Sequence, residues 1–240
     1  MALIITWQTV IMSLIIIDKK IPEEAKIKLS GYGDLLELET IGITYDAISG
    51  HPDIFFSVLN NDLIVAPNLP QKFREALKKH GISYHLGEQT VGKKYPESSI
   101  YNIVSTSQFL IHNLKHTDLA VKDLAMGLDQ IHVEQAYTRC NLIALKNERF
   151  ITSDKGIEKA LKKHSLEVFY ANPDGIILPG FKNGFIGGCT GISGNQLFLI
   201  GSLHHYSLGD KLRKQINAWG YEVVELYNGP VFDGGSVLFL

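Results

Sequence analysis

The stretch SGHPDIFF, residues 49–56, places two side chains that can transfer protons just ahead of an apolar run. His51 and Asp53 lie two positions apart, and in an extended strand residues i and i+2 face the same side. We therefore predict that both point into one place, where the imidazole would act as an acid or base and the carboxylate would hold a cation. In the alternative interpretation, Asp53 caps a turn and His51 is half exposed.

Cys189, in the segment IGGCTGISG, is the residue best suited to act as a nucleophile. Its glycine neighbours let backbone N–H groups approach the sulfur, and a cation such as Arg139 or His51 would lower the pKa of the thiol. The alternative is a small cysteine packed in a buried strand. Cys140 is expected to point away from the site and into the core, although a single bulge would exchange the two orientations.

The elements that must position these residues form a repeat. Each of five segments is a short apolar strand, then an amphipathic helix, then a second strand. The segment PQKFREALKKHG, for example, places Phe73, Ala76 and Leu77 on one helical face and ends at Gly81. The first strands end at positions spaced by roughly 40 to 50 residues, namely Asp18, Pro67, Asn113, Asp154 and Ser202.

A further short strand precedes each of the last four segments but not the first. The C-terminal segment GPVFDGGSVLFL has the missing form, with nothing after it. We therefore predict that the last strand completes the first module and closes a ring. The expected fold is α/β, a single domain over residues 1–240 built from five ββαβ modules, with strands around a central axis and helices outside.

Aligning the five opening strands places two sets of residues on the side that faces the axis. The first set is Asp53, Asn102, Asn141, Gly191 and Gly235, and the second is His51, Ile100, Arg139, Cys189 and Asp233. We predict that their polar members line a central cavity. Asn102 and Asn141 would contact a substrate or satisfy backbone groups. Arg139 and Asp233 would pair with each other, or bind a substrate carboxylate and amine respectively.

This arrangement resembles the pentein fold. That superfamily includes guanidine-modifying enzymes (arginine and agmatine deiminases, dimethylarginine hydrolases, amidinotransferases) and a non-catalytic ribosome anti-association factor. HPDIFF is similar to the His-x-Asp strand of the deiminases, and FDGGSVLFL is similar to their C-terminal Gly-Gly-Gly-Ser strand, which ends in His-Cys. Here Leu238 and Phe239 stand at those last two positions, so the usual cysteine nucleophile is missing there. The His-x-Asp pair also comes earlier in the chain than in the deiminases.

The resemblance implies a protein that binds a small polar ligand, bearing a guanidine, amidine or amine, in the central cavity. As an enzyme it would be a hydrolase acting on C–N bonds of amidines, with Cys189 as nucleophile and His51 as acid/base. Asp53 and Asp233 would hold the cationic group, with Asn102, Arg139 and Asn141 as further contacts. The rival expectation is a non-catalytic ring that serves as a binding or interaction module.

The composition bounds the class of partner. A net charge of -2, from 23 basic and 25 acidic residues, favours neither nucleic acid nor an anionic membrane. Two cysteines are too few for a disulfide scaffold, which favours the cytoplasm. His204 and His205 lack a partner at metal-ligand spacing, and no glycine-rich stretch matches a phosphate loop, so we predict no metal or other cofactor.

The N-terminal stretch MALIITWQTVIMSLIII is the one candidate targeting signal. It lacks a basic start and contains Gln8, Thr9 and Ser13, which favours a buried strand over a signal peptide. It is also too short and too interrupted for a transmembrane helix. Either Met1 or Met12 would serve as the natural start.

Overall fold

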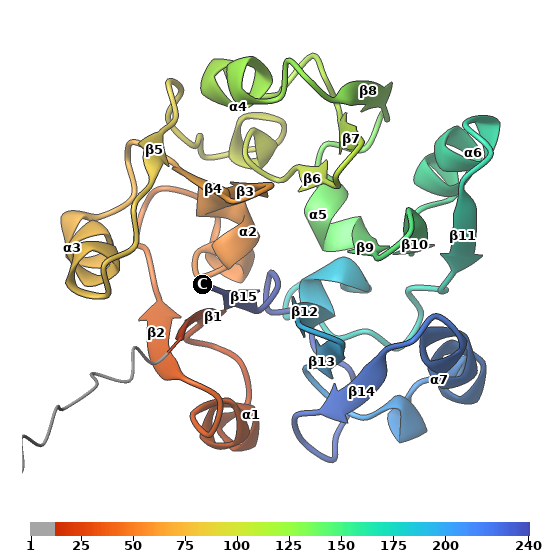
Figure 1. The fold of residues 1–240 in the computed structure, drawn as a ribbon. Helices are drawn as coiled ribbons and strands as arrows, with labels where there is room; N and C mark the ends of the chain where they lie inside the picture. Colours follow the sequence, from red (N-terminus) through yellow and green to blue (C-terminus); the bar gives the residue numbers. More distant parts are fainter. Residues whose placement is uncertain (1–12) are drawn as a thin grey trace, which may run out of the picture.

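The structure, a computed structural model, describes residues 13–240, which form five small three-stranded sheets arranged in a ring (Figure 1). The predicted α/β architecture of five ββαβ modules around a central axis is confirmed. Most of the apolar N-terminal stretch lies outside the described residues. Its last part forms strand β1 (Leu14–Asp18), which is buried along its whole length.

Each sheet has an inner, a middle and an outer strand, and the middle strand is antiparallel to the inner one and parallel to the outer one. The inner strands are β15 (Leu238–Phe239), β3 (Phe56–Leu59), β6 (Val104–Ser105), β9 (Leu142–Leu145) and β12 (Thr190–Ser193). The middle strands are β1, β4 (Asp62–Val65), β7 (Phe109–His112), β10 (Arg149–Thr152) and β13 (Gln196–Leu199). The outer strands are β2 (Asp34–Leu38), β5 (His85–Leu86), β8 (Asp129–His132), β11 (Glu167–Tyr170) and β14 (Glu222–Glu225).

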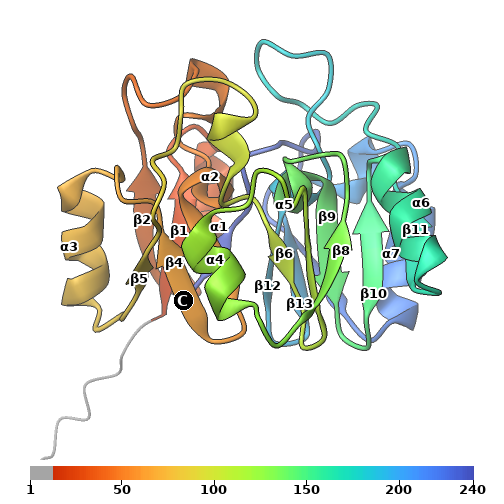
Figure 2. The same cartoon turned by 90° about the horizontal axis from the view of Figure 1, so that it is seen from above.

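The parallel middle and outer strands need a crossover, and a helix on the outside of the ring supplies it in every module (Figures 1 and 2). These helices are α1 (Glu23–Leu29), α3 (Gln71–Lys79), α4 (Leu119–Leu124), α6 (Lys155–Lys163) and α7 (Gly209–Ala218). Helix α6 is representative: Asp154 Oδ1 caps its first turn by accepting from Ile157 N at 2.8 Å. Ile157 and Leu161 are buried against the sheet, while the lysines stay outside. Among the described residues, no helix is long and apolar enough to cross a membrane.

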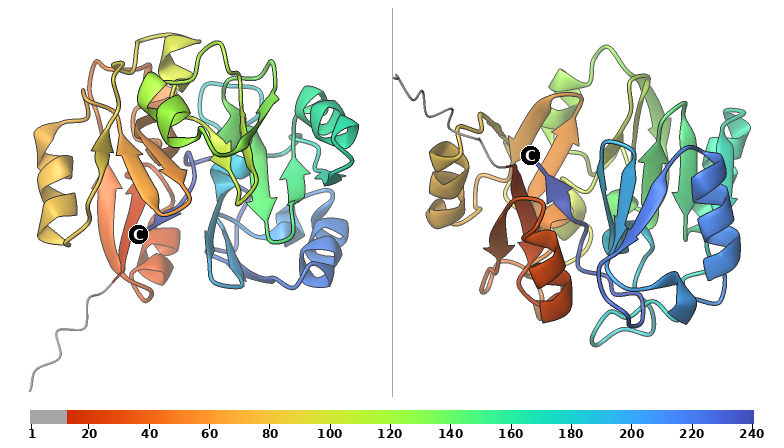
Figure 3. Two further views of the ribbon diagram at one scale, coloured as in Figure 1. Left: turned by 45° about the horizontal axis from the view of Figure 1, so that its top comes forward. Right: turned by 60° about the horizontal axis from the view of Figure 1, so that its bottom comes forward.

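The C-terminal strand closes the ring, as the sequence predicted. Strand β15 pairs with β1 at the closure of the ring (Figure 3). The pairing is antiparallel, with Ile15 opposite Phe239 and Ile16 opposite Leu238. Leu240 N donates to Leu14 O at 2.9 Å and Leu14 N donates to Leu240 O at 3.1 Å. The two ends of the described chain are thereby held together in one sheet.

Removing residues 238–240 should therefore destabilise the whole ring. The truncation leaves the buried edge of β1 without partners and removes the Phe239 ring, whose centroid lies 4.7 Å from that of Phe198. We expect a loss of at least about 2 kcal/mol in the free energy of unfolding. Chemical denaturation of the full-length and shortened chains measures this, and an unchanged midpoint would contradict the closing role.

The segments that lead into the inner strands are not extended, and this corrects one prediction. They form short helical turns, namely α2 (Pro52–Phe55), η2 (Glu97–Ser99), α5 (Thr138–Asn141) and η3 (Gly187–Cys189), with η1 (Asp46–Ile48) and η4 (Leu203–His205) in other loops. Pro52 occupies the first position of α2, where its fixed φ suits a helix start. The i, i+2 rule for strands therefore does not apply to His51 and Asp53, and their placement depends on how the turns pack.

Candidate active site

Three reactive side chains meet where α2 and α5 approach each other at the centre of the ring. One ring nitrogen of His51, one carboxylate oxygen of Asp53 and Cys140 Sγ all lie within 4.8 Å of one another. The Cys140 thiol donates to Asp53 Oδ2 at 3.2 Å. All three side chains are buried, with exposed fractions of 2%, 5% and 4%. The cluster joins a thiol, a carboxyl and an imidazole from two modules.

Neighbouring polar groups hold this cluster in place. Asn102 Nδ2 donates to the Asp53 carbonyl at 2.9 Å and to Cys140 Sγ at 3.2 Å, and Asn102 Oδ1 accepts from Cys140 N at 3.1 Å. Ser236 Oγ donates to Asp53 Oδ2 at 2.8 Å. Two buried atoms, His51 Nδ1 and Asp53 Oδ1, have no hydrogen-bond partner among the described residues. Such atoms are rare in folded proteins and are available to a ligand.

Gly235, in the DGGS segment ahead of β15, allows the closing segment to approach the cluster. Its φ of 65° lies in the left-handed region, and a Cβ at this position would stand 2.1 Å from His51 Cβ. Only glycine fits both conditions. The conformation of the C-terminal segment and the position of His51 are therefore coupled.

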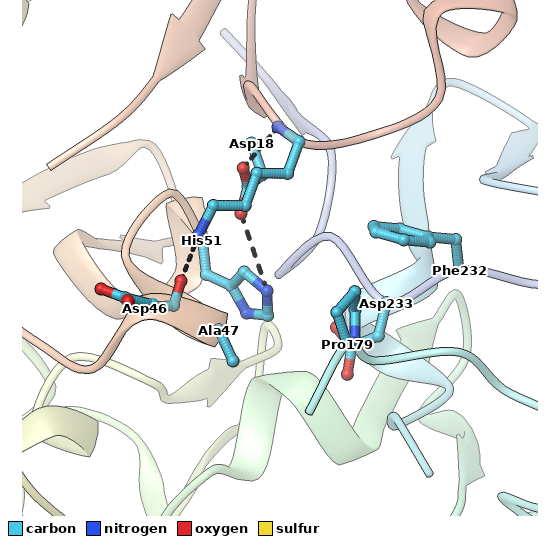
Figure 4. Close-up of a pocket in the computed structure, with 8 residues that line it drawn as sticks. Asp18, Asp46, Ala47, His51, Pro179, Phe232 and Asp233 are labelled. Carbon is cyan, nitrogen blue, oxygen red and sulfur yellow. Dashed lines mark hydrogen bonds and ion pairs between the residues drawn. The ribbon is translucent and has the colours of Figure 1, made fainter. Parts of the chain in front are cut away.

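Two cavities adjoin the cluster, and both are lined by His51 and Asp233. One, of about 200 Å³, is lined by Asp18, Lys20, Asp46, Ala47, His51, Pro179, Phe232 and Asp233 (Figure 4). The other, of about 110 Å³, is lined by Tyr45, Ile48, His51, Tyr137, Cys140, Leu178, Phe181, Asn183, Phe185 and Asp233. The Cys140 thiol and the His51 imidazole therefore face the same small cavity.

The imidazole is held neutral. Burial, and to a smaller extent the charge of Lys20, lowers the pKa of His51 to about 3. His51 Nε2 lies 3.8 Å from Asp18 Oδ2, and a dashed line in Figure 4 marks this contact. Burial raises the pKa of Asp18 to about 6, although its carboxylate accepts a hydrogen bond from Lys20 N at 2.7 Å. A neutral histidine beside a carboxyl can accept a proton.

The carboxyl groups around the cavities retain their protons more firmly than exposed ones. Burial, and then the charge of Asp53, raises the pKa of Asp233 to about 7, against hydrogen bonds from Phe185 N at 2.8 Å and Gly235 N at 3.1 Å. Burial also raises the pKa of Asp53, against the lowering effect of Arg139. A cation that enters the cavities would favour the ionised form of both groups.

Arg139 faces a different space from Asp233. Its guanidinium donates to Gly187 O at 3.1 Å and to Thr190 O at 3.4 Å. With Asp53 and Ser236 it lines a cavity of about 430 Å³ between the inner strands. Among the described residues, the ion pairs do not include one between Arg139 and Asp233, so the first alternative for this pair, a bridge across the axis, is not formed.

The positions of the two cysteines differ from those that the sequence predicted. Cys189 is fully buried in a core cluster, and its thiol donates to Phe185 O at 3.1 Å. It lines none of the three cavities described above. The prediction that Cys140 points away from the axis is wrong, because residues 138–141 form a helical turn rather than a strand. For both thiols burial raises the pKa well above its usual value.

The two asparagines that were predicted as substrate contacts make hydrogen bonds within the protein. Asn141 Nδ2 donates to Tyr137 O at 2.9 Å, and Asn141 Oδ1 accepts from Ser153 Oγ at 3.0 Å. Asn102 holds Asp53 and Cys140, as described above. A contact of either side chain with a substrate stays a prediction.

Sequence reasoning assigned no functional role to Asp18 or to the aromatic residues Tyr45, Tyr137 and Phe181. Asp18 carried a signal, since it is the polar end of the first repeated strand. The aromatic residues lie on loops without a repeat pattern, so only packing places them at the cavity.

Replacing Asn102 by alanine should loosen the cluster. The side chain is fully buried and makes three hydrogen bonds that join α2 to α5. Its removal leaves Cys140 N and the Asp53 carbonyl without these partners, and we expect a loss of about 2 kcal/mol in the free energy of unfolding. Denaturation curves measure it, with Asn195→Ala, on the exposed turn between β12 and β13, as the matched control. A loss no larger than that of the control would contradict the joining role.

The fold is shared with solved structures of an amidinotransferase, a DDAH and an agmatine deiminase. The amidinotransferase SxtG from Microseira wollei, of the saxitoxin biosynthetic pathway, is 11% identical with a TM-score of 0.56, over 89% of this chain and 88% of that chain. DDAH from Pseudomonas aeruginosa, complexed with citrulline, is 11% identical with a TM-score of 0.54, over 89% and 91%. The C. jejuni agmatine deiminase is 10% identical with a TM-score of 0.54, over 81% and 69%.

At such identities the likeness concerns the fold, and it confirms the predicted pentein resemblance. No curated protein matches the sequence significantly. The model of one protein family, described as "Family of unknown function (DUF6873)", matches residues 16–238. Since this match spans nearly all of the chain and the fold agrees with the pentein pattern, the protein belongs to the DUF6873 family.

Proposed function

We propose that the protein binds a small molecule with a guanidine, amidine or amine head in the cavities around His51 and Asp233, and that it hydrolyses a C–N bond of amidine-type heads with Cys140 as nucleophile. The observation that carries this proposal is the mutual approach of His51, Asp53 and Cys140, within 4.8 Å, beside the cavity that His51 and Cys140 line. This thiol replaces Cys189, the nucleophile that the sequence predicted.

The charges around the cavities suit a cationic head. Asp18 and Asp233 are buried carboxyls that line the cavity of about 200 Å³, and Asp233 also lines the cavity of about 110 Å³. Lys20, the cation nearest to them in the lining, is engaged elsewhere: its Nζ donates to Ser49 Oγ at 2.9 Å and to Asp46 O. A guanidinium or amidinium beside Asp233 would displace solvent and donate charge-assisted hydrogen bonds to the carboxylate.

The walls of the smaller cavity suit an apolar body attached to that head. Tyr45, Tyr137, Leu178, Phe181 and Phe185 supply its aromatic and aliphatic lining. The rings of Tyr45 and Phe181 lie 5.8 Å apart, and the hydroxyls of Tyr45 and Tyr137 are hydrogen-bonded at 3.1 Å. The lining contains neither arginine nor lysine for a substrate carboxylate. The favoured ligand is therefore a cation with an apolar or aromatic body.

The hydrolysis uses the contacts of the cluster. Cys140 Sγ attacks the amidino carbon, and the thiol proton passes to Asp53 Oδ2, which already accepts its hydrogen bond. The tetrahedral adduct breaks its C–N bond, and the leaving amine takes that proton from Asp53. Water then attacks the remaining thioimidate carbon while neutral His51 accepts a proton from it. The C–S bond breaks, the Cys140 thiolate recovers a proton from His51, and the amide product loses its remaining extra proton to solvent.

A matched pair of alkylating reagents tests the proposal. A haloacetamidine carries a cationic head, and the corresponding haloacetamide is neutral and nearly the same size. After division by the rates with a free thiol, we expect the cationic reagent to alkylate Cys140 at least about tenfold faster than the neutral one, since one charge-assisted contact is worth about 1.4 kcal/mol or more. Peptide mass spectrometry identifies the labelled cysteine. Equal normalised rates, or labelling at Cys189, would contradict the proposal.

A further inference from the structure

We propose that His51, Asp53 and Cys140 also form a binding site for a zinc-type divalent transition-metal ion, which regulates the site by occupying its nucleophile. The regulatory part rests on the proposed function, but metal binding itself does not. Imidazole nitrogen, carboxylate oxygen and thiolate sulfur are the three ligand types that zinc takes in proteins. The sequence predicted no metal site, because the three residues come from turns whose contact it does not show.

The three groups are close to the geometry that such an ion requires. Zinc bonds of about 2.0 to 2.3 Å place two tetrahedral ligand atoms roughly 3.5 Å apart. Cys140 Sγ and Asp53 Oδ2 are already 3.2 Å apart. One ring nitrogen of His51, one carboxylate oxygen of Asp53 and Cys140 Sγ all lie within 4.8 Å of one another. A displacement of about 1 Å by a ring or carboxylate would complete the set, with no movement of the backbone required.

Two unpartnered atoms point independently to a ligand here. His51 Nδ1 and Asp53 Oδ1 are buried and have no hydrogen-bond partner among residues 13–240, while the side chains are only 2% and 5% exposed. A buried acceptor without a partner costs free energy. An ion bound between the histidine, the aspartate and the thiolate would satisfy at least one atom of each residue.

The surroundings also match those of metal sites. A histidine ligand usually has a carboxylate, a backbone carbonyl or a water molecule on its other nitrogen, and Asp18 Oδ2 lies 3.8 Å from His51 Nε2. Ser236 Oγ donates to Asp53 and Asn102 Nδ2 donates to Cys140 Sγ, so the two anionic ligands are oriented. The cavity of about 110 Å³ on which His51 and Cys140 border leaves room for a water molecule as fourth ligand.

Metal binding deprotonates Cys140 and thereby blocks it as a nucleophile. The Cys140 thiol releases its proton to solvent as the metal–sulfur bond forms, and the charge of the divalent ion is then balanced by the thiolate and the Asp53 carboxylate. The thiolate cannot attack an amidino carbon while it is bound to the metal. Metal and amidine ligand therefore compete for the cavity.

Titration of the reduced, chelator-treated full chain with Co²⁺ tests the site, because cobalt replaces zinc and is coloured. We expect one equivalent to give visible d–d bands of a tetrahedral ion together with near-ultraviolet sulfur-to-cobalt charge-transfer absorption, both removed by added Zn²⁺. Cys140→Ser should remove the charge-transfer absorption, and His51→Ala should weaken binding at least about 100-fold. Asp18→Asn should weaken it about tenfold.

Cys189→Ser is the matched control, since this thiol donates to Phe185 O in the core, and it should keep the full spectrum. A second measurement avoids variants altogether: Zn²⁺ should slow alkylation of Cys140 by the neutral haloacetamide in the unaltered chain. Absence of the charge-transfer band, its survival in Cys140→Ser, or alkylation unaffected by Zn²⁺ would each overturn the metal site.

The outcomes separate this inference from the proposed function. Cobalt binding through Cys140 without preference for the cationic alkylating reagent would support the metal site and contradict the amidine function. Cation-directed alkylation of Cys140 without a cobalt spectrum would contradict the metal site and leave the function standing. Zinc that binds without slowing cation-directed alkylation would overturn the regulatory part.

Discussion

Replacing Cys140 by serine should abolish the proposed amidine hydrolysis, with kcat/KM lowered by at least about 10³-fold. The serine hydroxyl is a far weaker nucleophile than a thiol at neutral pH, yet it has nearly the same shape and can still donate to Asp53 Oδ2 as Cys140 does. The fold should therefore be kept while the covalent step is lost. Release of the amine or ammonia from an aryl or alkyl amidine, followed over time, measures the effect.

Cys189→Ser is the matched control for this prediction. Cys189 is fully buried and donates to the Phe185 carbonyl, and a serine can make the same hydrogen bond. We expect kcat/KM within about threefold of the unaltered protein, because the residue lines none of the described cavities. If Cys189→Ser were inactive and Cys140→Ser active, with both folded by circular dichroism, the assignment of the nucleophile would be reversed.

The affinity for a guanidinium ligand should rise with pH up to about 7 and then level off, with Asp233 as the main titrating group. Burial raises the pKa of this carboxyl to about 7, so below that pH it is largely protonated in the empty protein. A cation favours the ionised form, and binding below pH 7 must therefore release a proton. The affinity should fall by up to about tenfold for each pH unit of acidification.

Asp233→Asn should remove this dependence. The asparagine cannot ionise, so at pH 8 we expect affinity at least about tenfold below that of the unaltered protein, with a shallower slope near pH 7. Calorimetric titrations in buffers of different ionisation enthalpy measure the affinity and the protons released. Asp210→Asn, an exposed aspartate in the first turn of the outer helix α7, is the control. An unchanged slope in Asp233→Asn would exclude Asp233 as the group.

The repeated pattern predicted most of the architecture because it depends on local periodicity. Apolar strands, helices such as α6 with Ile157 and Leu161 on one face, and the C-terminal strand that completes the first module can be identified from spacing alone. His51 and Asp53 were placed near the axis, although through a strand that is in fact a helical turn. The module position was right, and the local conformation was wrong.

The choice between the two cysteines could not come from the same pattern. Alternation along a strand sends neighbouring residues to opposite sides, so a strand through residues 139–141 would point Cys140 away from the axis. The helical turn α5 instead directs Cys140 to Asp53, and the turn η3 leaves Cys189 in the core. The sequence therefore shows which residue types are present, but the direction in which each cysteine side chain points depends on the conformation of a single helical turn.

The sequence by itself determined the five modules, their closure and the set of polar residues at the strand starts. Only the tertiary structure decided which of these residues meet. Asp18, His51, Cys140 and Asp233 come from four distant parts of the chain, and their approach depends on the packing of turns from different modules. Periodicity specifies how each segment folds locally, whereas contacts between segments are set by side-chain packing across the axis, which no local pattern records.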